Sequence, residues 1–224
     1  MDRYRGFTLI ELLVVITILS ILIALSIAGL GLVRNMVGQT AAASNMRQIG
    51  MAVVSFSQDN NEFLPGPLKA GQGVVYNLAT PDQLATVLGP YLGVNQNGNP
   101  EILKIFIPPA YARAMGALDP KEYRPYVLNI NASLDGRNFF PWGDDKHLPT
   151  KTIALKQVWG FVETDQLNPL VAGQPWASKT PAKPLNDSVR LAWFFDGSVQ
   201  KIDQKTMLAF TGSGSPPPPP PPPK

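Results

Sequence analysis

The chain has 224 residues, a formal net charge of +3 and no cysteine. The lack of cysteine excludes disulfide bonds and thiol nucleophiles. Its basic residues form no cluster, so the charge does not favour nucleic-acid binding, and no G-x-S-x-G, H-E-x-x-H or P-loop pattern indicates an enzyme.

The first predicted element is an apolar helix of membrane length, in the segment from Arg5 to Val33. No residue between Leu12 and Val33 is charged. At about 1.5 Å per residue, this run spans roughly 30 Å, the thickness of the hydrocarbon core of a bilayer. Arg3 and Arg5 precede the run and most of the chain follows it. The positive-inside rule therefore predicts a single-pass helix with a cytoplasmic N-terminus, although Arg34 weakens the asymmetry.

A cleaved secretory signal is the alternative interpretation of this segment. The residues "SIAG" at Ser26–Gly29 have the small-x-small pattern of a signal peptidase site, with the cut after Ala28. The apolar run is, however, longer than the usual core of about 7–15 residues in a signal peptide. Glu11 would also be an unusual residue in a disposable leader. The sequence therefore favours a retained membrane helix.

Glu11 is the one carboxylate within the apolar segment. An ionised carboxylate in hydrocarbon costs about 2.5–3.5 kcal/mol, so a partner is expected. If the chain is cut between Gly6 and Phe7, the new α-amino group of Phe7 lies one helical turn from Glu11, on the same face. Glu11 would then neutralise that amine or the amine of a neighbouring copy, and every register that left it unpaired would be penalised. The alternative is a carboxylate that reaches the headgroups or is protonated.

The stretch "RGFTLIELLVVITILSILIAL" resembles the class III leader and first helix of type IV pilins and type II secretion pseudopilins. The resemblance rests on the basic tip, on Gly6 before Phe7, and on Glu11 at the fifth position after the cut. It implies that a prepilin peptidase cleaves after Gly6 and methylates the amine of Phe7. It also implies that Glu11 contacts the N-terminus of a neighbour during filament assembly. The proline that many pilins carry in the second half of this helix is missing here.

The helix is predicted to continue beyond the apolar run. In "NMRQIGMAVVSFSQDNNEFLP", Met46, Ile49, Val53 and Phe56 recur at steps of three, four and three, which forms an apolar stripe on one face. The pattern fades before Pro65. We expect a nearly continuous helix over residues 7–60, with its second half packed on a globular head.

The head is expected to contain a small antiparallel sheet packed against the second half of the long helix, so that the chain is α+β overall. In "TPDQLATVLGPYLG", Thr80 is predicted as an N-cap, with Pro81 in the first turn and Gln83 completing a capping box. The best strand candidates are "EYRPYVLNI", "KQVWGFVET" and "VRLAWFFDGSVQKID", because they are rich in β-branched and aromatic residues. Asp196-Gly197 predicts a hairpin turn in the last of them.

Several landmarks of the head resemble pilin-like proteins with an H-x9-DG motif, a group abundant in planctomycete and verrucomicrobial genomes. The landmarks are the helix segment above together with "LGPYLG", "IFIPPA", "YVLN" and "WFFDGSV". Two departures stand out. Asn186 occupies the place of the histidine, ten residues before Asp196 and Gly197, and the cysteines that members often carry are missing. Chemistry that depends on that histidine is therefore not expected here.

The remaining candidates are weak. Asp144, Asp145 and His147 in "GDDKHLP" suggest a metal site, but a solvated loop is the simpler reading, and we expect neither metal nor cofactor nor catalytic residue. The C-terminal stretch "TGSGSPPPPPPPPK" contains eight consecutive prolines. They predict a stiff polyproline II rod of roughly 25 Å, which would serve as a spacer, a docking epitope or a wall contact. The alternative is a disordered tail without a specific partner.

The expected organisation is a leader at 1–6, a membrane or filament-core helix at 7–33, a helix continuation at 34–62, a head at 63–210 and a tail at 211–224. The resemblance implies a structural subunit of a type IV pilus-like filament. It would lie in the bacterial inner membrane before assembly and in an extracellular or periplasmic filament afterwards. Its partners would be prepilin peptidase and copies of itself or related pilins. The alternatives are a pseudopilin or minor pilin and, from a different class, a membrane-tethered monomeric binding module for glycan or protein.

Overall fold

A computed structural model describes residues 8–94, 97–134, 137–143 and 157–212, which form two compact units, Met1–Gly38 and Gln39–Lys224. The domain boundaries predicted from the sequence remain predictions. The α-helices are α1 (Leu9–Asp59), α2 (Leu84–Leu88), α3 (Pro109–Met115) and α4 (Gln204–Ala209). The strands are β1 (Gly71–Gln72), β2 (Val75–Tyr76), β3 (Glu101–Ile102), β4 (Tyr126–Leu128), β5 (Ala132–Leu134), β6 (Arg137–Phe139), β7 (Trp159–Glu163), β8 (Arg190–Phe194) and β9 (Val199–Ile202). The 3₁₀ turns are η1 (Gly89–Leu92), η2 (Lys104–Phe106), η3 (Pro120–Glu122) and η6 (Ala177–Lys179).

Helix α1 has 51 residues and contains no proline, so no backbone donor is missing along it. It ends at Asp59 because Asn61 and Glu62 adopt positive φ angles of 55° and 67°. The Glu62 N–H donates to the carbonyl of Ser57 at 2.7 Å, which satisfies a carbonyl of the last turn. The predicted long helix is thus confirmed, and the residues before Thr8 lie outside the described part.

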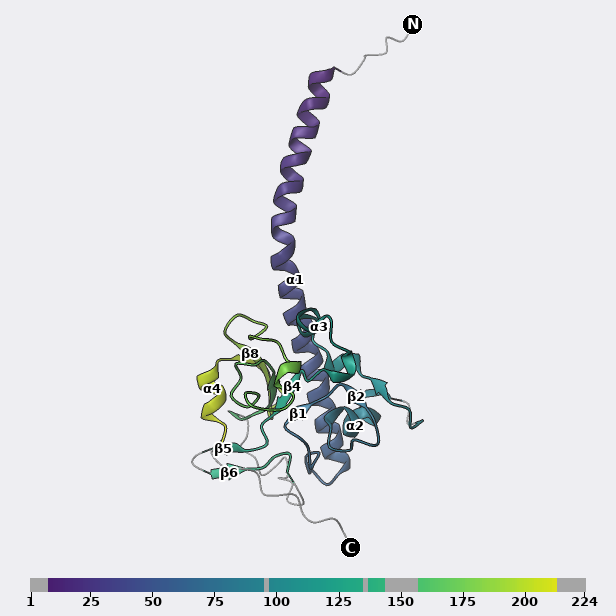
Figure 1. Cartoon of the computed structure of the whole chain (residues 1–224), viewed down its shortest axis with the longest axis vertical. Helices are drawn as coiled ribbons and strands as arrows, with labels where there is room; N and C mark the ends of the chain where they lie inside the picture. The colour runs from purple at the N-terminus through teal and green to yellow at the C-terminus, as the bar shows by residue number, and fades with distance from the viewer. Residues whose placement is uncertain (1–7, 95–96, 135–136, 144–156, 213–224) are drawn as a thin grey trace. The chain divides into compact units, whose positions relative to one another are not determined.

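The second unit is built on a five-stranded antiparallel sheet with the order β1-β4-β7-β8-β9, which confirms the α+β class (Figure 1). The three predicted strand segments supply β4, β7 and the β8–β9 hairpin. In the turn of that hairpin, Gly197 has a φ angle of 85°, a conformation that glycine adopts without strain. The carboxylate of Asp196 accepts the N–H of Ser198 at 2.8 Å. The predicted hairpin turn is therefore confirmed.

Both faces of this sheet are buried, and a bulge in β7 determines which side chains lie on which face. The pairing of β7 with β8 shifts register between Trp159 and Phe161. In a regular strand, residues two positions apart lie on the same face. Because Gly160 is an extra residue in β7, Trp159 and Phe161 instead lie on opposite faces. A Cβ atom on Gly160 would stand 2.8 Å from Trp193, so the bulge also needs a residue without a side chain.

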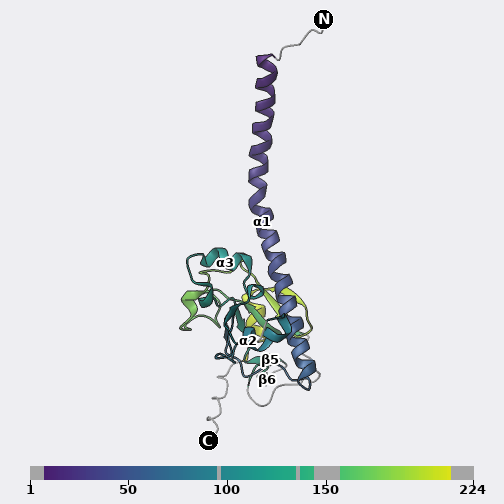
Figure 2. The same ribbon diagram turned by 90° about the vertical axis from the view of Figure 1, so that its right-hand side faces the viewer.

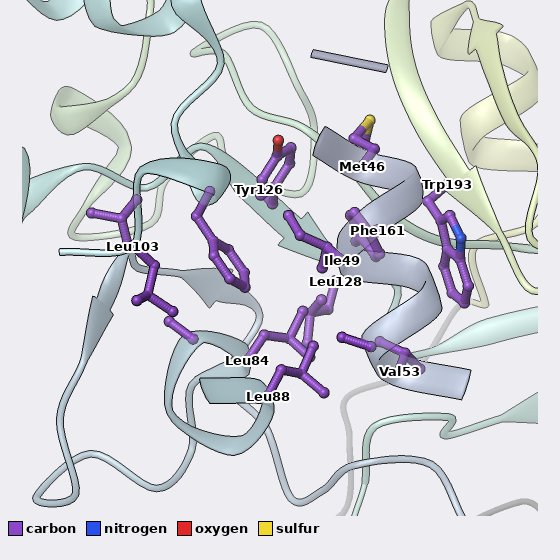
Figure 3. Packing of buried hydrophobic residues seen from close by; sticks show 14 of the residues in the cluster. Met46, Ile49, Val53, Leu84, Leu88, Leu103, Tyr126, Leu128, Phe161 and Trp193 are labelled. Carbon is purple, nitrogen blue, oxygen red and sulfur yellow. The ribbon is translucent and has the colours of Figure 1, made fainter. Parts of the chain in front are cut away.

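The second half of α1 covers one face of the sheet (Figure 3). Met46, Ile49 and Val53 are fully buried there, and Phe56 is half-buried with its ring 5.8 Å from that of Tyr91. The predicted apolar stripe is thus part of the core. The side chains that it meets come from the sheet and from α2: Leu84, Leu88, Tyr126, Leu128, Phe161 and Trp193.

The opposite face of the sheet packs against α4. The carboxylate of Asp203 accepts the N–H of Thr206 at 2.7 Å and caps this helix. Met207 is buried on the sheet, and its carbonyl accepts the indole N–H of Trp159 at 3.0 Å. Figures 1 and 2 both place α3 and the β5–β6 hairpin at opposite ends of this unit.

The predicted start of the helix in "TPDQLATVLGPYLG" is wrong. Helix α2 begins at Leu84, without a side-chain cap, rather than after Thr80. The hydroxyl of Thr80 donates to the carbonyl of Asn77, and the side chain of Gln83 accepts the N–H of Gly73 at 2.6 Å. The side chains expected to form a capping box therefore hold the loops around β1 and β2 instead.

Candidate functional site

The first candidate site is the start of α1, where Thr8 and Glu11 form a capping box. The Thr8 N–H and hydroxyl donate to Oε2 of Glu11 at 2.9 and 2.8 Å. The Glu11 N–H in turn donates to the Thr8 hydroxyl at 3.3 Å. A carboxylate in the first turn also interacts favourably with the helix dipole.

The sequence analysis did not identify Thr8 as a partner of Glu11, although the pattern Thr-x-x-Glu is the usual signature of a capping box. The carboxylate of Glu11 is therefore held by Thr8 of its own helix, whether or not it also pairs with an amine. Gly6 and Phe7, the predicted processing residues, lie outside the described residues. The pairing of Glu11 with an amine is therefore still a prediction.

The segment that follows is long and apolar enough to cross a membrane, from Leu9 to Ser26, and none of its residues is buried within the chain. Its three hydroxyl groups are satisfied by the helix itself. Thr17 donates to the carbonyl of Leu13 at 2.7 Å, and Ser20 and Ser26 likewise donate to carbonyls four residues earlier. Because these donors are paired within the helix, they add little to the cost of hydrocarbon surroundings.

The second candidate site contains the H-x9-DG positions of the head. Asn186 lies in the loop before β8, whereas Asp196 and Gly197 form the turn after it. The five residues of β8 span about 16 Å, so the structure does not bring the two parts of the motif together. Asp196 and Gly197 act as turn residues, and Asn186 belongs to a different environment.

Asn186 is the partner of a buried carboxylate. Its side-chain amide donates to Oε2 of Glu163 at 2.9 Å, and the N–H of Leu191 donates to the same oxygen at 3.0 Å. Glu163 is only 3% exposed, and burial raises its pKa to about 7, because the ionised form loses its hydration. Tyr126 lies opposite Glu163 in the sheet, and burial raises its pKa as well.

A second buried carboxylate stands beside this one. Asp165 accepts two hydrogen bonds from the guanidinium of Arg190, at 2.5 and 2.9 Å, and both side chains are almost fully buried. The charge of Asp165 raises the pKa of Glu163, while that of Arg190 lowers it. Both carboxylates are buried, and their bonds to Arg190 and to the Leu191 N–H connect β7 and the loop after it to β8.

Within residues 8–94, 97–134, 137–143 and 157–212, no group of three histidine or acidic residues could hold a metal ion. The metal candidates Asp144, Asp145 and His147 lie outside these ranges, as does the proline run of the tail. The structure therefore does not test whether Asp144, Asp145 and His147 bind a metal, or whether the tail forms a polyproline II rod.

Comparison with known proteins gives one result, and it concerns the N-terminus. Residues 1–32 match the family model of the prokaryotic N-terminal methylation motif. No curated protein and no solved structure matches the chain. The match supports a type IV pilin-like class III leader followed by an apolar helix, which is consistent with membrane anchoring. The resemblance of the head to the H-x9-DG group is not confirmed by it.

Proposed function

We propose that this chain is the precursor of a structural subunit of a type IV pilus-like filament. A prepilin peptidase would cleave it between Gly6 and Phe7 and methylate the new amine, and α1 would then assemble with copies of itself or related pilins. The observation that carries the proposal is the match of residues 1–32 to the N-terminal methylation motif, within which the apolar segment Leu9–Ser26 has no buried residue.

The capping box supports this proposal physically. Thr8 holds the carboxylate of Glu11 at the first turn of α1, one residue from the cleavage position proposed before Phe7. A helix start that carries an amine opposes its own dipole, so a carboxylate fixed at this position offsets the charge. In a bundle of such helices, the same carboxylate would select the register in which each amine has a partner.

The finer assignment rests on the basic residues Arg3 and Arg5 and on the landmarks of the head. Before assembly the helix would anchor the chain in the bacterial inner membrane with its N-terminus in the cytoplasm, and the head would reach the extracellular or periplasmic side. We place the chain in the H-x9-DG group, with Asn186 in the histidine position. A pseudopilin or minor pilin would share the leader and the helix, and a pseudopilin would stay in the cell envelope.

The deciding experiment is mass spectrometry of the N-terminal peptide of the mature protein, taken from membranes and from sheared surface material. A peptide that begins with N-methylated Phe7 is expected in both fractions for a surface filament, and in the envelope alone for a pseudopilin. A peptide that begins at Gly29 would show that an ordinary signal peptide is removed, and the proposal would fail.

Replacement of Glu11 by alanine separates a filament subunit from a membrane-tethered monomer. The subunit is expected to lose assembly while its membrane level is unchanged. A tethered monomer would behave as the unsubstituted chain. Leu12→Ala is the matched control, because it removes apolar surface next to Glu11 without removing the charge.

A further inference from the structure

The second unit contains a cleft of about 920 Å³ that none of the preceding assignments uses. Its walls come from the edge strand β1, the β2–β3 ribbon, the turn η3 and the loop that precedes η6. Figure 1 labels β1 and β2, two of the strands that contribute residues to these walls. All of these segments belong to the unit Gln39–Lys224, so no residue of the apolar segment lines the cleft.

Two glycines allow larger side chains to approach the floor of the cleft. A Cβ atom on Gly71 would stand 2.5 Å from the indole of Trp176, so the ring lies directly against the backbone of β1. A Cβ atom on Gly73 would stand 3.2 Å from the guanidinium of Arg124. Arg124 is also held by a 2.8 Å hydrogen bond to the carbonyl of Tyr123. The cleft therefore carries a fixed, half-buried aromatic ring and a fixed cation.

The charge of the cleft is positive. Lys69 is paired with Asp82 at 2.6 Å, which leaves Lys121 and Arg124 as the other charged side chains on its walls. In the part of the chain that the structure describes, neither of these has a carboxylate within 4.0 Å. Two cations without a counter-charge in a concave site favour an anionic ligand.

We propose that this cleft binds an acidic oligosaccharide, a sugar chain that bears carboxylates. The guanidinium of Arg124 and the ammonium of Lys121 match a carboxylate. The indole of Trp176 offers an apolar surface to the C–H groups of a sugar ring, with a polar N–H at its edge. The amides of Asn77 and Gln174, which also line the cleft, match sugar hydroxyls.

The test measures binding of trigalacturonic acid to the full-length chain in detergent micelles by isothermal titration calorimetry. Its methyl ester is the uncharged counterpart, and an oligoglutamate of the same charge represents acidic peptides. The variant is Lys121→Gln/Arg124→Gln, and the matched control is Lys183→Gln/Lys205→Gln, which removes two exposed cations that do not line the cleft. Thermal unfolding of each variant is recorded in parallel.

We expect saturable binding of trigalacturonic acid that weakens at high salt. The cleft variant should bind about tenfold or more weakly, since charge-assisted hydrogen bonds are lost, and the control should bind as the unsubstituted chain does. If the double variant unfolds at a lower temperature, the single variant Lys121→Gln, at an exposed position, is used in its place. It should also bind trigalacturonic acid more weakly, with a smaller loss of affinity than the double variant.

The proposal would be overturned if binding is not saturable, if the methyl ester binds equally well, or if the cleft variant binds equally well. Oligoglutamate that binds as tightly as trigalacturonic acid would also overturn it, and would assign the cleft to acidic peptides. None of these results bears on cleavage at Gly6, so failure here is distinguishable from failure of the filament proposal.

Discussion

The indole of Trp193 lies so close to Gly50 that a Cβ atom on this glycine would stand 1.9 Å from Nε1. Gly50 lies on α1 and Trp193 on β8, so this contact joins the helix to the sheet. Trp193 is 1% exposed and stacks on Phe161 with ring centroids 5.2 Å apart. Its N–H has no acceptor among the described residues. The close approach thus requires a residue without a side chain at position 50.

Gly50→Ala is expected to destabilise the chain by about 1–3 kcal/mol because the indole must move within a packed core. The sign is informative, since the same change inside a helix ordinarily stabilises it by about 0.5–1 kcal/mol. Thermal unfolding of the full-length chain, followed by tryptophan fluorescence, measures the effect. Met51→Ala, at an exposed position of the same helix, should change the stability much less. A stabilising Gly50→Ala would contradict the contact.

The raised pKa of Glu163 makes the stability of the head depend on pH. The pKa lies near its ordinary value of 4.5 in the unfolded chain and at about 7 in the folded one. The folded state therefore holds the proton more tightly, and stability falls as the pH rises from about 4.5 to about 7. We expect a loss on the order of 3 kcal/mol across this range.

Glu163→Gln should remove this part of the pH dependence. Its amide oxygen still accepts hydrogen bonds from Asn186 and the Leu191 N–H, but the group no longer ionises. Urea unfolding at pH 5 and pH 8 measures the effect, with Glu101→Gln, an exposed carboxylate on β3, as the control. A pH dependence equal in Glu163→Gln and in the unsubstituted chain would show that Glu163 is not its source.

Asn186 provides a separate test of the same cluster. Asn186→Leu removes one of the two donors to Oε2 of Glu163, and we expect a loss of about 1–3 kcal/mol because a buried acceptor loses its partner. Asn186→His places an imidazole beside the carboxylate and should retain more stability. It should also lower the pKa of Glu163, since the imidazolium is an opposite charge. Equal stability of the leucine and histidine variants would argue against a donor role for position 186.

In the proposed filament, Thr8 is expected to support assembly by holding the carboxylate of Glu11. Thr8→Ala removes the hydroxyl that bonds both to the carboxylate and to the N–H of Glu11, and costs about 1 kcal/mol at the helix start. The yield of sheared filaments should fall, but less than in Glu11→Ala. Thr8→Ser keeps the hydroxyl and should assemble nearly as well as the unsubstituted chain. A filament yield unaffected by Thr8→Ala would mean that the cap does not position Glu11.

Local signals in the sequence determined the apolar helix, the stripe at Met46, Ile49 and Val53, and the hairpin turn at Asp196-Gly197. Each of these depends on residues a few positions apart, where the helical period or the backbone freedom of glycine decides the outcome. The start of α2 was misplaced because the local signals around Thr80 and Gln83 were outweighed by contacts with Asn77 and Gly73.

The tertiary structure alone decided the pairing of Glu163 with Asn186, the contact of Gly50 with Trp193, and the position of Trp176 over Gly71. These partners are separated by 23 residues in the first pair and by far more in the others. Local sequence patterns do not predict which of these distant residues come into contact, because the contacts are set by sheet register and by the packing of helix on sheet. The apolar N-terminal helix could therefore be predicted from the sequence. The cluster of buried charges and the cleft of the head form only when distant strands pair.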